Sequence, residues 1–192
     1  MKVIKTGMEG FLVIEPDVFS DDRGFFLETF QSDRYKAVGI TDSFVQDNQS
    51  RSTRGILRGL HFLVKQPQAQ LITVLRGRVF DVGVDIRPKS ATFGRWFGAE
   101  LSDSGGARQI YMAPGFAHGF CTLEDNTEVT YKISGSYAPE KSGGIFWNDP
   151  DLGIDWPVKA SKAVLSEKDQ IHPTLKDSPV EFLYNKDNNL AR

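Results

Sequence analysis

The sequence is poor in cysteine, in net charge and in long apolar runs. Its single cysteine, Cys121, permits no internal disulfide, so we expect a buried structural thiol and a cytoplasmic protein. The formal net charge of -2 provides no general attraction to nucleic acid. No apolar run approaches the about 20 residues that a membrane helix needs, and the N-terminus lacks a signal peptide's apolar stretch. We therefore expect neither a nucleic acid nor a membrane as partner.

Short strand-like segments dominate what the sequence does contain, and its hydrophobic content of 40% is enough for a buried core. Residues 78–86 alternate between apolar and other side chains, which is typical of a β-strand. Residues 70–75 precede them across Gly77, so the two runs predict a β-hairpin. Further strands are expected at 93–101, 108–113, 118–123 and 127–134. Glycine or proline between short strands favours a sandwich or barrel.

Helix signals are few. Residues 32–38 predict a short helix capped by Ser32. Residues 161–169 predict a second helix, which must end before Pro173. After residue 157 the chain becomes more polar. We therefore predict a single domain over 1–192, with a barrel core at about 10–157 and a C-terminal packing arm at about 158–192.

Histidine is scarce, because only His61, His118 and His172 are present. A lone histidine among apolar neighbours is more often a core residue than a functional one. His172 lies in a polar stretch and is predicted at the surface. A histidine-based metal site commonly uses a His-x-His pair, whereas Phe62 and Leu63 follow His61. Since His61 and His118 alone leave too few imidazoles, the sequence favours a pocket without a metal.

Without a metal, histidine can act as a general acid or base. Removal of a proton beside a ketone needs a base with a pKa near the working pH, a donor to the enolate oxygen and an acid that returns a proton. Tyr131 shares its strand parity with Val129 and Ile133, so its ring is predicted to point into the barrel as a candidate acid. A core tyrosine that donates to a backbone carbonyl is the alternative, and both interpretations stay open.

Several short segments carry a more specific signal: residues 22–30, 44–50, 55–62, 77–87, 90–94, 114–120, 147–150 and 153–157. Residues 55–62 read Gly-Ile-Leu-Arg-Gly-Leu-His-Phe, for example. Taken in order over nearly the whole chain, the segments resemble the dTDP-4-dehydrorhamnose 3,5-epimerase family. The resemblance implies an all-β jelly-roll cupin barrel with a few short peripheral helices. It also implies a homodimer, with the N-terminal strand a candidate for exchange, and an isomerase without a metal or organic cofactor.

The resemblance also implies roles for individual residues around a dTDP-linked 4-keto-6-deoxy sugar. The base falls on His61, its carboxylate partner on Asp169, and the acid on Tyr131. Tyr137 falls on the aromatic residue that stacks against thymine. The substrate-binding positions are Arg23, Phe26, Glu28, Gln46, Asp47, Asn48, Arg58, Gln70, His118, Tyr137 and Lys168.

Two residues of the proposed pocket present a geometric difficulty. Arg58 and His61 are three positions apart, so they face opposite sides of an unbroken strand. Both can serve one pocket if the strand twists or bulges between them. Gly59 is well placed to allow this.

The chain departs from the family pattern at Gln70, where a lysine usually helps to stabilise the enolate oxygen. Loss of one such donor costs about 2.7–4 kcal/mol in other enzymes. Lys65 is a candidate replacement, and Ser142 stands where the family often has glutamate. Three functions therefore stay open: epimerisation at C3 and C5, epimerisation at one carbon or of another nucleotide-linked 4-keto deoxysugar, and nucleotide-sugar binding without catalysis.

Overall fold

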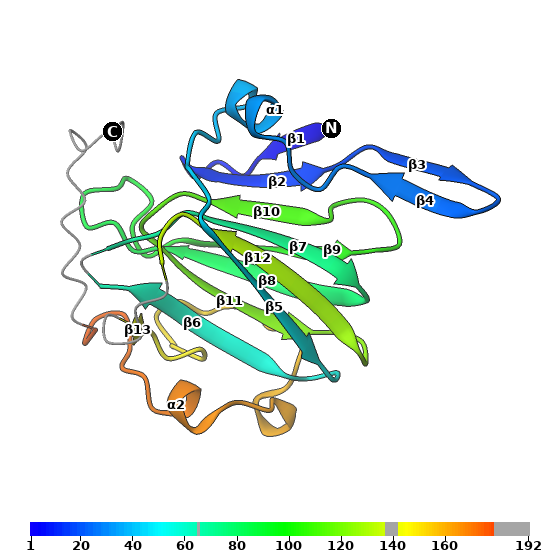
Figure 1. Cartoon of the computed structure of the whole chain (residues 1–192). Coiled ribbons are helices and arrows are strands. Elements are labelled where there is room, and N and C mark those ends of the chain that lie inside the picture. The colour runs from blue at the N-terminus through cyan, green and yellow to red at the C-terminus, as the bar shows by residue number, and fades with distance from the viewer. Residues whose placement is uncertain (65, 137–141, 179–192) are drawn as a thin grey trace.

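The computed structural model describes residues 1–64, 66–136 and 142–178, which form two antiparallel sheets and a separate hairpin (Figure 1). The six-stranded sheet has the order β1 (Lys2–Lys5), β2 (Phe11–Glu15), β10 (Gln109–Met112), β7 (Gln70–Arg76), β12 (Thr127–Ile133) and β5 (Gln46–Ser52). The five-stranded sheet has the order β13 (Ser142–Gly144), β6 (Leu57–Leu63), β11 (Phe116–Thr122), β8 (Arg78–Asp85) and β9 (Trp96–Ser102). The hairpin joins β3 (Val18–Asp21) to β4 (Gly24–Leu27). The all-β jelly-roll prediction is confirmed.

The described helices are short, as expected, although their details differ from the prediction. In α1 (Ser32–Ala37), Gln31 rather than Ser32 is the cap, and its Oε1 accepts from the backbone N–H of Arg34 at 2.7 Å. The helix predicted over 161–169 is wrong. A 3-10 helix (Ala160–Lys162) is followed by extended backbone and then by α2 (Glu167–Gln170). Val164 breaks the helix because its N–H donates to the Gly55 carbonyl at 3.0 Å.

None of the helices in the described part of the chain has the length and apolar character that crossing a membrane requires.

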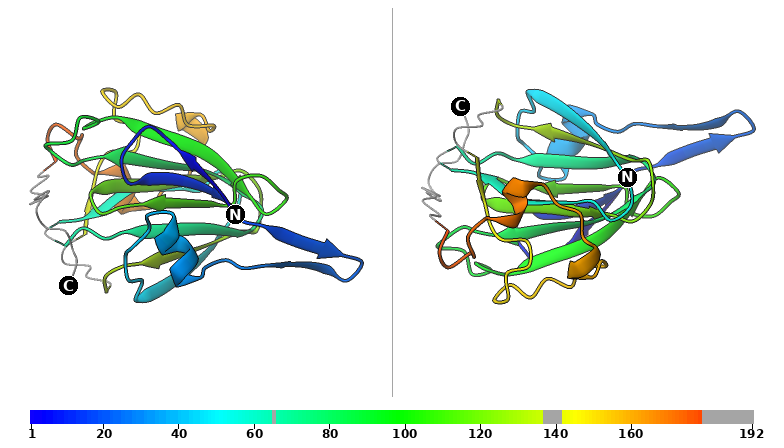
Figure 2. Two further views of the ribbon diagram at one scale, coloured as in Figure 1. Left: turned by 90° about the horizontal axis from the view of Figure 1, so that it is seen from above. Right: turned by 90° about the horizontal axis from the view of Figure 1, so that it is seen from below.

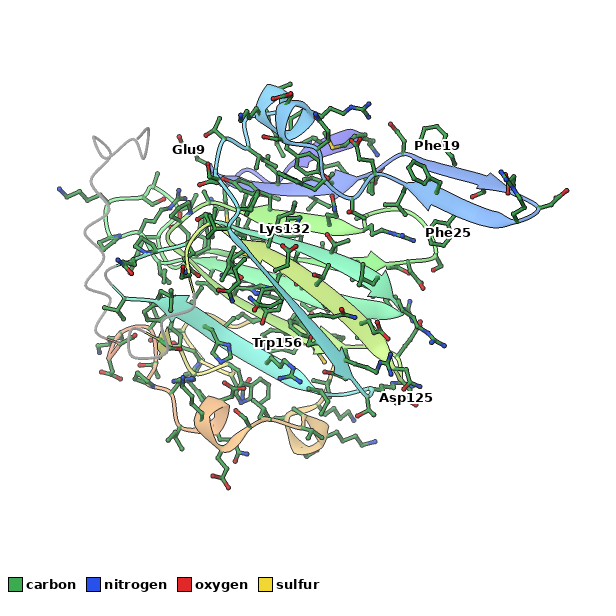
Figure 3. All side chains as sticks on the ribbon, in the orientation of Figure 1. Glu9, Phe19, Phe25, Asp125, Lys132 and Trp156 are labelled. Atoms are coloured by element: carbon green, nitrogen blue, oxygen red, sulfur yellow. The ribbon has the colours of Figure 1, made fainter. Side chains whose placement is uncertain are left out.

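Apolar side chains are buried in three clusters, one between the sheets and one on the outer face of each sheet. The cluster between the sheets includes Phe11, Ile72, Val79, Ile110 and Val129. Residues 145–165 cover the outer face of the five-stranded sheet, where Trp156 is buried (Figure 3). Helix α1 covers the outer face of the six-stranded sheet through Tyr35. Each sheet therefore buries apolar side chains on both of its faces, which leaves polar inner positions available for a pocket.

The hairpin predicted from residues 70–75 and 78–86 is wrong. Strand β7 pairs with β10 and β12, whereas β8 pairs with β11 and β9 in the other sheet. The chain crosses between the sheets at Gly77, which has φ +77° and whose added Cβ would lie 2.6 Å from Thr127 Oγ1. A glycine suits this turn because it adopts positive φ and leaves room for Thr127. The other expected strands are confirmed to within a few residues.

In strand β8, the alternate apolar side chains point outward and the polar side chains between them point inward. Val82 and Val84 lie in the outer cluster, while Asp81 and Asp85 are fully buried. The Asp85 carboxylate accepts from Arg87 Nε at 2.8 Å, Ser90 Oγ at 2.6 Å and Thr92 Oγ1 at 2.6 Å. Burial raises the pKa of Asp85, but these hydrogen bonds outweigh it and hold the pKa below its usual value. Asp85 therefore stabilises the fold as a carboxylate.

Asp85→Asn is expected to lower the free energy of unfolding by about 3–5 kcal/mol near neutral pH, because Arg87 stays buried after its carboxylate is lost. The folded pKa lies below the unfolded one. The stabilisation is therefore fully present above about pH 4 and is lost as the pH falls through the folded pKa. Urea unfolding at several pH values measures it, with exposed Asp155→Asn as control. A stability difference that persists unchanged into acid would contradict the prediction.

Candidate active site

A cavity of about 480 Å³ opens between the sheets and receives side chains from both of them. The six-stranded sheet contributes Gln46, Asn48, Ser50, Gln70, Tyr131 and Ile133. The five-stranded sheet contributes Arg58, His61, Phe116, His118, Phe120 and Ser142, and the C-terminal segment adds Ser166, Lys168 and Asp169. The cavity thus brings together the three residues that the resemblance implied as catalytic.

His61 is oriented by Asp169, as the resemblance implied. Ser166 caps α2 by accepting from the backbone N–H of Asp169 at 3.2 Å, and this places Asp169 Oδ1 2.5 Å from His61 Nε2. Burial raises the pKa of Asp169, but the hydrogen bond and charge of His61 outweigh it and hold the pKa below its usual value. Because an ionised carboxylate only accepts, Nε2 carries the proton and His61 Nδ1 keeps the lone pair of a base.

Arg58 and His61 line the same cavity because the parity of β6 reverses at Gly59. Leu57 and Leu60 both belong to the outer cluster, although an unbroken strand would direct them to opposite faces. The pairing of β6 with β11 shifts register over this stretch. Gly59 has φ +125°, and its added Cβ would lie 2.5 Å from Gly119 Cα. The break in the strand that was expected at Gly59, by a twist or a bulge, is therefore present.

Tyr131 faces the cavity from the sheet opposite His61. It lies on β12, in register with Asn48 on β5, and packs against the cluster between the sheets. The predicted inward orientation is confirmed. Asn48 lines the same wall and accepts a hydrogen bond from Gln46 Nε2 at 2.8 Å. His61 and Tyr131 therefore reach the cavity from opposite sheets.

His118 lies directly across the strand pair from His61 and has its own carboxylate. Its Nε2 is 2.9 Å from Oδ2 of Asp81, which is completely buried. Burial raises the pKa of Asp81, and the charge of His118 opposes this rise only in part. Asp81 is a site residue that the sequence reasoning missed. Asp81 could have been found from the sequence, because its carboxylate lies on the inward-facing side of a strand that is rich in apolar residues.

Four residues with an implied binding role do not line this chain's cavity. Asp47 lies on the outer face of β5, where Lys132 Nζ donates to it at 3.0 Å (Figure 3). Arg23 and Phe26 lie in the exposed β3–β4 hairpin. Glu28 is 3.3 Å from Arg34 Nη1. Tyr137 and Lys65, which were also singled out, lie outside the described residues.

Lys168 brings a cation to the cavity wall, where it contacts Ser142. Its Nζ donates to Ser142 Oγ at 3.2 Å, and both residues line the cavity with Gln70. Ser142 stands where a glutamate was expected, so here a hydroxyl meets the lysine. The described residues that line the cavity include one arginine, Arg58, and one lysine, Lys168. These two cations are therefore available to an anionic ligand.

The prediction that His172 lies at the surface is wrong. Only 10% of its side chain is exposed, and its ring packs against Gly144, where an added Cβ would lie 2.4 Å from Nε2. The ring centroid is 5.9 Å from that of His61. Burial and then the nearby charge of His61 lower the pKa of His172, against the opposing effect of Asp169. The polar sequence around it concealed this position, because the chain folds back against β13.

The jelly roll, with an oriented histidine and a tyrosine on opposite walls of its cavity, places the chain among the cupin-like epimerases. The model of the dTDP-4-dehydrorhamnose 3,5-epimerase family matches residues 5–177, so the chain belongs to this family. A dTDP-4-dehydrorhamnose 3,5-epimerase from Methanothermobacter thermautotrophicus is 47% identical, covering 93% of this chain and 97% of the relative. A dTDP-4-dehydrorhamnose 3-epimerase from Streptomyces niveus is 41% identical, covering 88% and 82%.

A solved structure agrees with these sequence matches. The dTDP-6-deoxy-D-glucose-3,5-epimerase of Legionella pneumophila, in complex with dTDP-4-keto-L-rhamnose, is 44% identical and superimposes with a TM-score of 0.87. The match covers 97% of this chain and 95% of the other. The family resemblance seen in the sequence motifs is confirmed.

Gly59→Ala is expected to reduce kcat/KM by about 100-fold, because displacement of catalytic groups by about 1 Å has that effect. Its Cβ would collide with the Gly119 backbone, and overpacking should also cost about 1–3 kcal/mol of stability. Gly39→Ala is the matched control, since Gly39 also has positive φ but its added Cβ would meet nothing within 4 Å. Steady-state kinetics and thermal unfolding measure both effects. Equal losses in the two variants would contradict the contact with Gly119.

Proposed function

We propose that the protein epimerises dTDP-4-dehydro-6-deoxy-D-glucose at C3 and C5 to give dTDP-4-dehydro-L-rhamnose. Family membership supports this substrate. The single observation that carries the mechanism is the position of His61 and Tyr131 on opposite walls of one cavity. Inversion of a carbon requires that a proton leaves from one face and returns to the other, and groups on opposing sheets meet this requirement.

The reaction begins at His61. The C4 ketone acidifies the adjacent C–H bonds, and the lone pair on Nδ1 takes the proton while the bonding electrons move onto the C4 oxygen. Asp169 stabilises the imidazolium that forms, because its Oδ1 accepts a hydrogen bond from His61 Nε2–H, with 2.5 Å between the two heavy atoms. Tyr131 then donates its hydroxyl proton to the opposite face of the carbon. Exchange with water returns His61 and Tyr131 to their starting states before the second carbon reacts.

The enolate oxygen needs a donor, and Gln70 takes the place of the family's lysine. An amide N–H can donate but carries no charge, so it stabilises an oxyanion less than a cation does. Lys168 and His118 line the same cavity and are further donors. We assign Gln70 to the enolate oxygen, with Lys168 as the neighbouring cation.

The nucleotide diphosphate is assigned to the polar and cationic lining. The guanidinium of Arg58 matches phosphate oxygens in a bidentate manner, and Gln46 and Asn48 offer amide donors beside it. Asp47 faces outward in the described chain and has no assigned contact. The thymine-stacking role of Tyr137 rests on the resemblance alone.

The proposal includes a homodimer in which the β3–β4 hairpin enters the partner's site. The hairpin projects from the body in every view (Figures 1 and 2). Phe19, Phe25 and Phe26 are 65%, 60% and 70% exposed, which is unusual for large apolar side chains and indicates an interface (Figure 3). The same segment carries Arg23, so a partner's cavity would receive Arg23 and Phe26 together. Strand β1 pairs with β2 in its own chain, which makes the hairpin the better candidate for exchange.

We also treat the chain as one domain, because the arm after residue 157 supplies Asp169 to a histidine of the barrel. A cytoplasmic location stays a prediction that rests on the single thiol. Cys121 is buried, which raises its pKa to about 11 and keeps it protonated.

Solvent-deuterium incorporation tests the function. With dTDP-4-dehydro-6-deoxy-D-glucose in heavy water, NMR should locate label at both C3 and C5. Label at C3 alone would indicate the activity named for the Streptomyces niveus relative, and no label would indicate a binding protein. His61→Asn should lose exchange by at least about 100-fold while binding of dTDP persists. Tyr131→Phe should slow product formation more than the first exchange. Exchange that survives in His61→Asn would overturn the assigned base.

Gln70→Lys tests whether the missing cation limits the rate. Restoring the charge should raise kcat by up to about 100-fold, which is the low end of the effect of one oxyanion donor. KM should change little, because the charge acts on the enolate rather than on the bound ketone. Gln68→Lys on the same cavity wall is the matched control. A kcat that falls in Gln70→Lys would indicate that other donors already hold the enolate oxygen.

A further inference from the structure

The His172 imidazole has a buried nitrogen with no use in the reaction. Its Nε2 is inaccessible to solvent and makes no hydrogen bond to the described residues. The nearest recorded acid, Asp169 Oδ1, is 3.7 Å away, which is beyond hydrogen-bonding distance. A buried polar atom without a partner destabilises the fold, and such atoms often mark the place of a water or an ion.

The surroundings of this nitrogen form a ligand set for a metal ion. One ring nitrogen each of His61 and His172 and one carboxylate oxygen of Asp169 lie within 4.8 Å of one another. Two imidazoles and a carboxylate, with a position left for water, are a common set for zinc. The sequence predicted no metal site because His172 was expected at the surface, which left too few imidazoles as ligands. His118 is excluded from this set, since its Nε2 contacts Asp81.

We propose that His61, Asp169 and His172 form a site for a divalent transition-metal ion such as Zn²⁺, and that metal bound there inhibits the enzyme. The inhibitory part rests on the role of His61 proposed above. Binding releases the proton of His61 Nε2 to solvent, the electron pair of this nitrogen goes to the metal, and Nδ1 takes up a proton from solvent, so the imidazole stays neutral. A neutral imidazole keeps one proton, which then resides on Nδ1. His61 therefore loses the lone pair that takes the substrate's proton.

Small movements complete the geometry. The donor atoms of tetrahedral zinc lie about 3.4 Å apart, whereas His61 Nε2 and Asp169 Oδ1 are 2.5 Å apart. His61 must therefore withdraw by about 1 Å from the carboxylate. Its side chain is 44% exposed to the cavity, so it has room to do so. The Nε2 edge of the His172 ring packs against Gly144, so His172 forms the fixed side of the site.

Co²⁺ and Zn²⁺ test the proposal on the intact protein. Co²⁺ should give the visible absorption of a four-coordinate nitrogen and oxygen site, and Zn²⁺ should abolish this absorption by displacement. Zn²⁺ should also inhibit exchange at C3 and C5, and a chelator should restore it. His172→Asn should weaken both effects by at least about 10-fold, because loss of an outer-shell partner alone costs that much. Glu167→Gln on exposed α2 is the matched control and should change neither.

The outcomes separate this site from the proposed function. Each variant is compared with its own rate without metal, and His172→Gln provides a second variant if His172→Asn does not fold. Absence of a Co²⁺ absorption, or equal zinc inhibition with and without His172, would overturn the metal site. A protein that shows the Co²⁺ absorption but no solvent exchange would instead overturn the epimerase assignment and leave the site intact.

Discussion

The site depends on one close approach, in which Gly59 of β6 lies against the backbone of Gly119 in β11. This contact leaves no room for a side chain, and it accompanies the reversal of parity that turns Arg58 and His61 to the same face. Without the reversal one of them would point into the apolar outer cluster. A steric constraint on two glycines therefore determines whether Arg58 and His61 share one cavity.

The second constraint is that each sheet buries apolar side chains on both of its faces. Most apolar side chains of β8 point outward into the outer cluster. The side chains that point inward can therefore be polar, as in Asp81 and Asp85. Asp81 supports His118, whereas Asp85 is bonded to Arg87, Ser90 and Thr92. Acidic residues on one strand thus serve the site and the fold separately, and the hydrogen-bonding partners of each decide which.

Much of this was available from sequence, and the failures have physical causes. Alternation located the later strands, and Gly59 indicated the bulge, since both are local properties of the chain. The hairpin at Gly77 failed because strand pairing is not local: β7 and β8 find their partners in different sheets. His172 was misplaced because a polar stretch predicts exposure, whereas the fold returns that stretch to Gly144. Motif order identified the family, but the sequence did not reveal which implied contacts, such as those of Arg23, lie away from the chain's own cavity.

The C-terminal segment has a consequence for the time at which the protein becomes active. His61, the proposed base, lies on β6, but the carboxylate that orients it lies 108 residues later in the chain. On the ribosome, all the strands of both sheets are synthesised before α2 emerges. His61 therefore leaves the ribosome before the carboxylate that orients it. Under the proposed mechanism, a chain without α2 keeps the histidine but lacks its carboxylate partner.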